Sequence, residues 1–197
     1  MLKGTVKNSK GRLLSKAIVE LKDKDFRTIL KTKTDESGYF EIQEESGFYP
    51  FLTVVKDYGE AYLEFWGLNI DLKDNHSLKV VIGANELYGT NVFKVFGTFN
   101  PIFIYFRPMN LKKFKSDDKD ISPNINQDSI IVKVDDLSTN LLSFQQVKEH
   151  VDNKGKYLTA YLIQLERSSP NWQKIELKLT DKHNDVGMAI IYNKWYN

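Results

Sequence analysis

The chain has 197 residues, with 28 basic and 26 acidic side chains and a net charge of +2. Such a balanced chain lacks the basic face that binding to nucleic-acid phosphates requires, so we expect no nucleic-acid partner. Cysteine is absent, which excludes disulfides, thiolate nucleophiles and thiolate metal sites. Hydrophobic residues make up 41% and aromatic residues 13% of the chain, enough for one large or two small β-rich cores.

The first 84 residues contain seven short segments with strand character. Val19 and Leu21 alternate with Glu20 and Lys22, the period expected of a strand with one buried face. Gly, Asn, Asp and Ser residues separate the segments. The expected strands are 2–7, 17–22, 28–34, 39–44, 49–56, 62–69 and 78–83. This rhythm predicts a small Greek-key β-sandwich.

Two glycine turns and their surroundings form a family pattern. Its residues are Gly4, Val6, Gly11, Ala17, Val19, Leu21, Thr34, Asp35, Gly38 and Phe40. Gly11 and Gly38 fall in polar turns, where glycine adopts a positive φ without steric cost. The pattern resembles the carboxypeptidase regulatory-like family, whose domains are transthyretin-like β-sandwiches. The resemblance covers residues 1–84 and implies a structural, folding-assisting or adhesive module, since the zinc ligands of carboxypeptidases belong to a separate catalytic domain.

Residues 85–197 are expected to form a second sandwich. The expected strands are 92–96, 102–106, 129–134, 141–144, 157–167, 173–180 and 188–192. Residues 177–187 resemble the closing hairpin of bacterial immunoglobulin-like modules, so we predict an all-β protein with two tandem sandwiches, transthyretin-like and then immunoglobulin-like. Residues 112–120 are predicted to form a solvated loop or helical turn, and residues 145–151 a short helix.

The residues that carry chemistry in other proteins form no catalytic motif here. The histidines, His76, His150 and His183, lie in polar contexts without zinc-binding spacing, so we expect them at the surface. The sequence contains no Gly-x-Ser-x-Gly elbow and no Gly-x-Gly-x-x-Gly loop. We therefore expect no catalytic residue, no metal, no cofactor and no enzymatic activity.

Three groups of oxygen-bearing residues leave calcium binding open. They are Asp117, Asp118 and Asp120; Asp181, Asn184 and Asp185; and the pair Asp135 and Asp136. Calcium takes six to eight oxygen ligands. Lysines surround the first group and would neutralise it, so we favour solvated loops.

An aromatic segment rich in carboxylates is the candidate functional surface. Its residues are Tyr58, Glu60, Tyr62, Glu64 and Trp66. In a strand, Tyr62, Glu64 and Trp66 share one face, while the residues between them fit the core. Aromatic rings give a large contact area at low entropy cost, so they recur at interfaces. Burial against the second half, a partner-protein surface and a platform that stacks on sugar rings all remain open.

These patterns predict a non-catalytic structural or binding protein that makes protein–protein or assembly contacts. A carbohydrate-binding module using Tyr62 and Trp66 is one alternative, and a hydrolase-associated accessory protein is another. No apolar run approaches the ~18 residues of a membrane span, so we expect none. The first strand begins almost at once, which predicts no signal peptide and a cytoplasmic location; a secreted or cell-surface bacterial protein is the alternative if a leader was removed. The sequence leaves the oligomeric state open.

Overall fold

The computed structural model describes residues 1–44, 46–97, 99, 102–116, 118–150, 152, 155, 157–166 and 171–194. Within these residues the protein is all-β, as the sequence predicts, with a single short α-helix. The strands of the first half are β1 (Leu2–Asn8), β2 (Ile18–Lys22), β3 (Thr28–Lys33), β4 (Tyr39–Ile42), β5 (Phe48–Val55), β6 (Phe65–Asp71) and β7 (His76–Ile82). The second half contains β8 (Asn85–Lys94), β9 (Ile102–Asn110), α1 (Leu111–Lys115), a 3₁₀ turn (Gln127–Ser129), β10 (Ile130–Val134), β11 (Leu137–Thr139), β12 (Leu141–His150), β13 (Tyr157–Leu165), β14 (Lys174–Thr180) and β15 (Val186–Tyr192).

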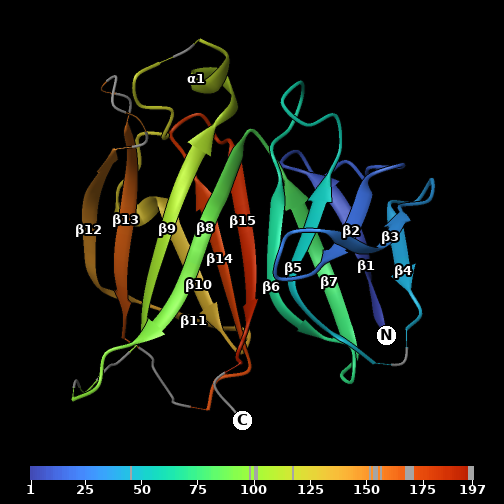
Figure 1. Cartoon of the computed structure of the whole chain (residues 1–197). Helices are drawn as coiled ribbons and strands as arrows, with labels where there is room; N and C mark the ends of the chain where they lie inside the picture. The colour runs from blue at the N-terminus through green and yellow to red at the C-terminus, as the bar shows by residue number, and fades with distance from the viewer. Residues whose placement is uncertain are drawn as a thin grey trace.

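One long sheet runs through both halves of the molecule. Its strand order is β11-β10-β14-β15-β6-β5-β2-β3, and two smaller sheets have the orders β4-β1-β7 and β12-β13-β9-β8. β6 and β15 lie side by side in the centre of Figure 1 and pair in parallel, with Trp66 opposite Ala189 and Leu68 opposite Ile191. The two halves are therefore joined by backbone hydrogen bonds as well as by side-chain packing.

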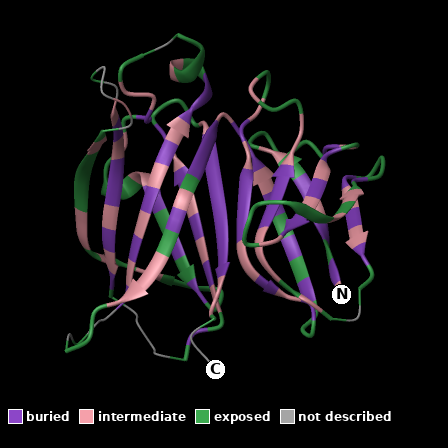
Figure 2. Ribbon diagram, viewed as in Figure 1, coloured by how far each residue is buried: buried purple, intermediate pink, exposed green. Residues whose placement is uncertain are grey.

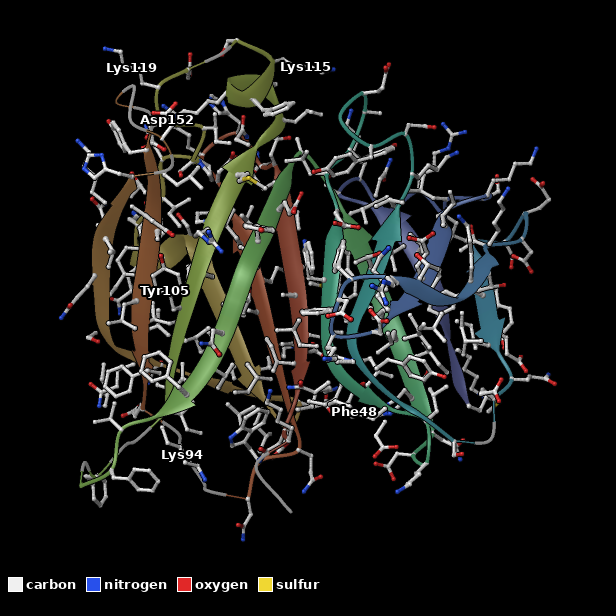
Figure 3. The ribbon with its side chains drawn as sticks, viewed as in Figure 1. Phe48, Lys94, Tyr105, Lys115, Lys119 and Asp152 are labelled. Carbon is white, nitrogen blue, oxygen red and sulfur yellow. The ribbon has the colours of Figure 1, made fainter. Side chains whose placement is uncertain are left out.

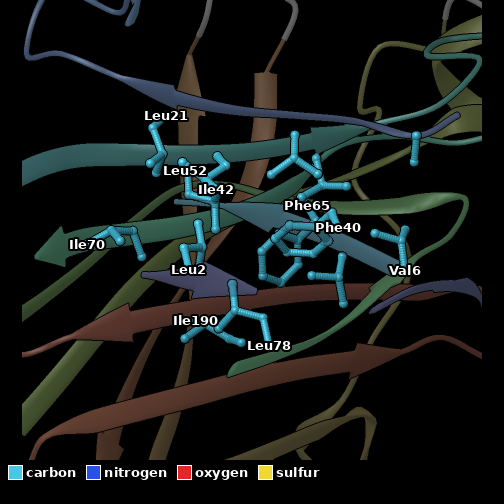
Figure 4. Packing of buried hydrophobic residues seen from close by; sticks show 14 of the residues in the cluster. Leu2, Val6, Leu21, Phe40, Ile42, Leu52, Phe65, Ile70, Leu78 and Ile190 are labelled. Carbon is cyan, nitrogen blue, oxygen red and sulfur yellow. The ribbon is translucent and has the colours of Figure 1, made fainter. Parts of the chain in front are cut away.

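The two smaller sheets cover opposite faces of the long sheet. Met188 and Ile190 of β15 pack in the core beneath the three-stranded sheet, together with the residues of Figure 4. Ala189 and Ile191 pack in the other core, beneath the four-stranded sheet. Because successive side chains of a strand point to opposite faces, β15 belongs to both cores.

β6 and β15 are consequently buried on both faces. Residues 186–191 are all buried, and the two strands are mostly purple in Figure 2. The adjacent side chains Phe65 and Trp66 of β6 enter different cores. Strands buried on both faces have nearly continuous apolar sequences without alternation, as β15 does over residues 186–191.

The glycine turns of the first half are confirmed, since Gly11 and Gly38 have φ values of 82° and 70°. An added Cβ on Gly38 would also lie 2.8 Å from the carbonyl oxygen of Val6, so the turn packs closely against β1. The division into residues 1–84 and 85–197, and the transthyretin-like and immunoglobulin-like assignments, stay predictions. The long sheet draws strands from both ranges.

Two expectations about local structure are wrong. Gln145 to His150 belong to the strand β12, which pairs with β13 as far as His150, and not to a helix. Their polar side chains are mainly exposed because β12 is an edge strand. His76 is buried rather than at the surface, with Nε2 2.7 Å from the carbonyl oxygen of Asp71 and the ring 4.4 Å from that of Tyr192.

Among the described residues, no helix has both the length and the apolar character needed to cross a membrane.

Candidate binding site at the junction of the two halves

The five residues of the predicted surface do not share one face. β6 begins only at Phe65, so Tyr62 and Glu64 precede it, and the Gly59 amide donates to the Tyr62 carbonyl in a turn. Tyr62 packs against the first core, and its hydroxyl accepts from the amide of Asn8 at 3.5 Å. Trp66 is only 8% exposed and packs in the second core.

Tyr58 and Glu60 lie in the exposed turn before β6. The Tyr58 side chain is half exposed, and its hydroxyl donates to Glu86 Oε2 over 3.4 Å. The Glu60 carbonyl accepts from Lys115 Nζ at 2.6 Å, which links this turn to α1. The Tyr58 hydroxyl, the Glu64 amide and the Trp66 indole therefore meet at Glu86. Tyr62 forms a backbone bridge with Tyr58, but its ring packs against the first core.

Glu86 is a buried carboxylate that the sequence analysis did not identify. Oε1 accepts from Trp66 Nε1 at 2.9 Å, and Oε2 accepts from the backbone amide of Glu64 at 3.3 Å. Burial raises the pKa of Glu86, while these hydrogen bonds oppose that increase. A glutamate between Asn85 and Leu87 gives no sign of burial in the sequence, so this anchor of the Trp66 ring was missed.

Glu64 lies beside this buried carboxylate. Burial, together with the nearby charge of Glu86, raises the pKa of Glu64 to about 7. Burial also raises the pKa of the Tyr58 hydroxyl, which faces both carboxylates. Burial therefore disfavours the ionised form of both carboxylates beside Trp66.

A pocket of about 340 Å³ lies where β5 and β6 meet β8 and β9; we call it the junction pocket. Its lining residues are Lys24, Phe26, Phe51, Trp66, Leu68, Tyr88, Gly89, Thr90 and Arg107. β5 and β6 supply three apolar side chains, the β2–β3 connection supplies two residues, and β8 and β9 supply the remainder. The pocket lies on the face of the long sheet that carries the second core. There it is lined by Phe51 of β5 and by residues of β8, the edge strand of the four-stranded sheet.

Four aromatic rings contact one another in the junction pocket. The Trp66 ring stacks on Phe26 with centroids 5.5 Å apart, and meets Tyr88 edge-on at 5.7 Å and Phe51 at 6.3 Å. Trp66 is thus the centre of the cluster and forms its buried base. Phe26 and Tyr88 are 45% and 38% exposed, so their rings are available to a ligand.

Arg107 gives the pocket a cationic wall. Its guanidinium lies 4.5 Å from the centroid of the Tyr88 ring, and Nη1 is 3.4 Å from Glu149 Oε1. Gly89 has a φ of 59°, and a Cβ there would lie 2.4 Å from Arg107 Nη2, so glycine makes room for this side chain.

The chemistry of the lining suits binding. The lining includes two cationic side chains, Lys24 and Arg107. It includes no carboxylate, and Glu64 and Glu86 are not among the lining residues. Such a surface favours an apolar or aromatic group that also carries carbonyl or anionic oxygens. The sequence analysis identified Trp66 but not Phe26, Tyr88 or Arg107, which are distant in the chain.

The carboxylates of the second proposed calcium loop have structural partners. Asp181 Oδ1 accepts from the amides of His183 and Asp185, which closes the turn between β14 and β15. Its Oδ2 accepts from Asn85 Nδ2 at 3.1 Å. In the first loop, Asp120 accepts from Thr159, whereas Asp117 lies outside the described residues. Within the described part of the chain, no group of three or more His, Asp or Glu side chains is placed to hold a metal ion.

No family model and no curated protein matches the chain. Among solved structures it is similar to a DUF3823 family protein from Bacteroides ovatus, at 10% identity and a TM-score of 0.32, with 97% of each chain covered. It is also similar to two structures of BcpA, the major pilin subunit of Bacillus cereus, both with TM-scores of 0.30. The first pilin structure is 12% identical, and the match covers 97% of this chain and 68% of the pilin chain. The second is 15% identical, and the match covers 96% of this chain and 66% of the pilin chain. Similarities this low carry no argument about function.

Proposed function

We propose that this protein is a non-catalytic binding protein that makes assembly contacts by receiving an apolar side chain of a partner protein in the junction pocket. The observation that carries this proposal is the pocket itself, which has a buried Trp66 base and partly exposed walls formed by Phe26 and Tyr88. Of the predicted surface residues, Trp66 lines the pocket. The Tyr58 hydroxyl and the Glu64 backbone amide donate hydrogen bonds to Glu86, the carboxylate that also binds Trp66 Nε1. Glu60 and Tyr62 stay a sequence-based prediction.

The geometry supports this function in two ways. A volume of about 340 Å³ accommodates a phenyl or indole side chain, and the bound ring would meet Phe26 and Tyr88 in the stacked or edge-on arrangements that aromatic pairs prefer. Lys24 and Arg107 are placed to donate hydrogen bonds to backbone carbonyls or carboxylates that accompany such a side chain. The resemblance of residues 1–84 to the carboxypeptidase regulatory-like family agrees with a module that binds rather than catalyses.

Binding is tested by titrating the ¹⁵N-labelled protein with N-acetyl-phenylalaninamide and following the tryptophan indole resonances. We expect the Trp66 resonance to shift, because Trp66 forms the base of the pocket. Phe26→Ala and Tyr88→Ala should each weaken binding about fivefold, the effect of losing one ring pair. Phe48→Ala is the matched control, since Phe48 is half exposed on β5 and lies outside the pocket (Figure 3). An unchanged Trp66 resonance, or an equal loss in the control, would contradict the proposal.

A carbohydrate ligand is the second candidate. The observation that favours it is the position of the Tyr88 ring beside the hydrogen-bond donors of Arg107, since sugar rings stack on aromatic faces and bind donors through their hydroxyl groups. A glycan array probed with the wild type and with Tyr88→Ala tests this function. Binding that Tyr88→Ala abolishes would support it, and an array without signal would count against it.

A further inference from the structure

The described residues of the connection between β8 and β9, 95–97 and 99, include two exposed aromatic side chains. Phe96 is 92% exposed and Phe99 is 96% exposed, whereas Phe93 and Phe103 at the base of the connection stack with centroids 5.8 Å apart. β8 ends at the lower left of Figure 1, and its last residue, Lys94, is labelled in Figure 3. Single exposed apolar residues are common, but two nearly bare phenylalanines on one short connection indicate a surface that another molecule covers.

The same chain carries the junction pocket, whose lining includes several aromatic rings. We propose that Phe96 and Phe99 of one copy insert into the junction pocket of a second copy, so that the protein associates head to tail. This inference rests on the proposed function and names the partner as another copy of this chain. The pocket of about 340 Å³ matches one phenyl ring fully and a second in part, and its exposed walls are the aromatic rings of Phe26 and Tyr88.

The geometry of this contact determines the kind of assembly. A protrusion on one part of the chain and a receptor on another form a heterologous contact, which extends into open chains instead of closing as a symmetric dimer. A fully buried aromatic ring contributes about 150–250 Å², so two rings and the surface that receives them bury at most about 600–1,000 Å² in total. This area is smaller than that of stable specific interfaces, so the association should be weak and dependent on concentration.

The charges favour a protein partner over a lipid surface. Loops that bind anionic membranes place several lysines or arginines beside their apolar side chains. The described residues 92–97, 99 and 102–106 contain a single lysine, Lys94, and no arginine. A protein partner also brings backbone carbonyls, and Lys24 and Arg107 in the pocket lining are donors for such groups.

The test is sedimentation velocity at chain concentrations from about 10 µM to about 1 mM, the range of weak association. The wild type should shift from monomer to larger species as the concentration rises. The loop variant Phe96→Ser/Phe99→Ser and the pocket variant Phe26→Asn/Tyr88→Ser should each remain monomeric. Asparagine suits position 26, where φ is 63°. The control variant Phe48→Ser/Phe114→Ser removes two half-exposed phenylalanines elsewhere and should associate like the wild type.

Mixing the two variants provides the decisive measurement. The loop variant keeps its pocket and the pocket variant keeps its loop, so an equimolar mixture should form a heterodimer and nothing larger. Two monomers in the mixture, or longer chains, would overturn the inference. If the pocket variant fails to fold, the ¹⁵N-labelled loop variant is titrated with unlabelled wild type, and an unshifted Trp66 indole resonance would overturn it.

The remaining outcomes separate this inference from the proposed function. A wild type that stays monomeric at about 1 mM, a concentration where weak interfaces assemble, but whose Trp66 resonance responds to N-acetyl-phenylalaninamide, disproves self-association and leaves the binding function intact. No response in either experiment disproves both. A monomer that binds phosphatidylserine vesicles, and loses that binding in the loop variant, replaces the second copy with a membrane surface.

Discussion

Polar residues usually lie at the surface of a protein and large apolar residues in its core, and both ends of β8 depart from this rule. At the first end, the polar side chains of Asn85 and Glu86 are buried; beyond the last residue of the strand, the apolar side chains of Phe96 and Phe99 are exposed. Asn85 Nδ2 donates to the Asp185 carbonyl, and Glu86 accepts from Trp66. The buried polar groups thus have hydrogen-bond partners inside the chain, whereas the rings of Phe96 and Phe99 are almost fully exposed. We therefore expect substitutions near Glu86 to change the stability of the fold, and substitutions of Phe96 and Phe99 to change the association between molecules.

The largest effect on stability is expected for Trp66→Ala. This change removes a buried ring that contacts Phe26, Phe51 and Tyr88, and we expect a loss of about 4 kcal/mol in the free energy of unfolding. Urea unfolding followed by circular dichroism measures the loss. Phe48→Ala, which removes a half-exposed ring, should cost about 1 kcal/mol or less. Equal losses in the two variants would mean that Trp66 does not stabilise the junction.

The next effect is expected for Glu86→Ala. The substitution leaves the indole N–H of Trp66 and the backbone amide of Glu64 without their acceptor in a buried site, which should cost about 3 kcal/mol. Glu86→Gln keeps an acceptor oxygen and should cost about 1 kcal/mol. Unfolding titrations of the two variants side by side check the difference. An alanine variant as stable as the glutamine variant would contradict the role assigned to these hydrogen bonds.

A smaller effect depends on pH through Glu64. Its pKa is raised from its ordinary value of 4.5 to about 7, so the folded state binds this proton more tightly than the unfolded state. The stabilisation is complete below pH 4.5 and is lost as the pH rises through 7. Between about pH 5 and 8, the wild type should lose about 2 kcal/mol relative to Glu64→Gln. A constant difference between the two proteins across this range would show that the pKa of Glu64 is not raised.

The smallest effect on stability is expected beyond the other end of β8. Because Phe96 and Phe99 are almost fully exposed, Phe96→Ser/Phe99→Ser should change the free energy of unfolding by no more than about 0.5 kcal/mol. Thermal unfolding at low protein concentration measures this change without a contribution from association. A loss above about 1 kcal/mol would show that these rings pack within their own chain, and the contrast between the two ends would not hold.

The sequence predicts most strands because their physical signals are local. In β14, Ile175, Leu177 and Leu179 are buried and alternate with half-buried polar residues, and the expected strand 173–180 agrees with Lys174–Thr180. β12 was partly mistaken for a helix, because an exposed edge strand places polar residues on both faces and so loses its alternation. The pairing of β6 with β15 has no local signal, since strands buried on both faces show no period and these two are far apart in the chain.

The same reasoning explains what the sequence indicates about the site. Trp66 is identifiable because a large aromatic residue stands beside carboxylates in a short segment. Phe26, Tyr88 and Arg107 have no such context, and they become neighbours only when the β2–β3 connection, β8 and β9 meet over the long sheet. Glu86 resembles any exposed strand residue in the sequence, because its burial depends on a donor, Trp66 Nε1, that lies 20 residues away.

The pairing of β6 with β15 is the central claim, because it fixes the two halves together and so forms the junction pocket. Native-state hydrogen exchange measures it most directly, at the backbone amides of residues 66–68 and 189–191. The hydrogen-bonded amides of this pairing should exchange only through global unfolding, as slowly as those within β5 and β14. Exchange of the junction amides orders of magnitude faster than those of β5 and β14 would show that the halves separate, and would contradict a preformed pocket between them.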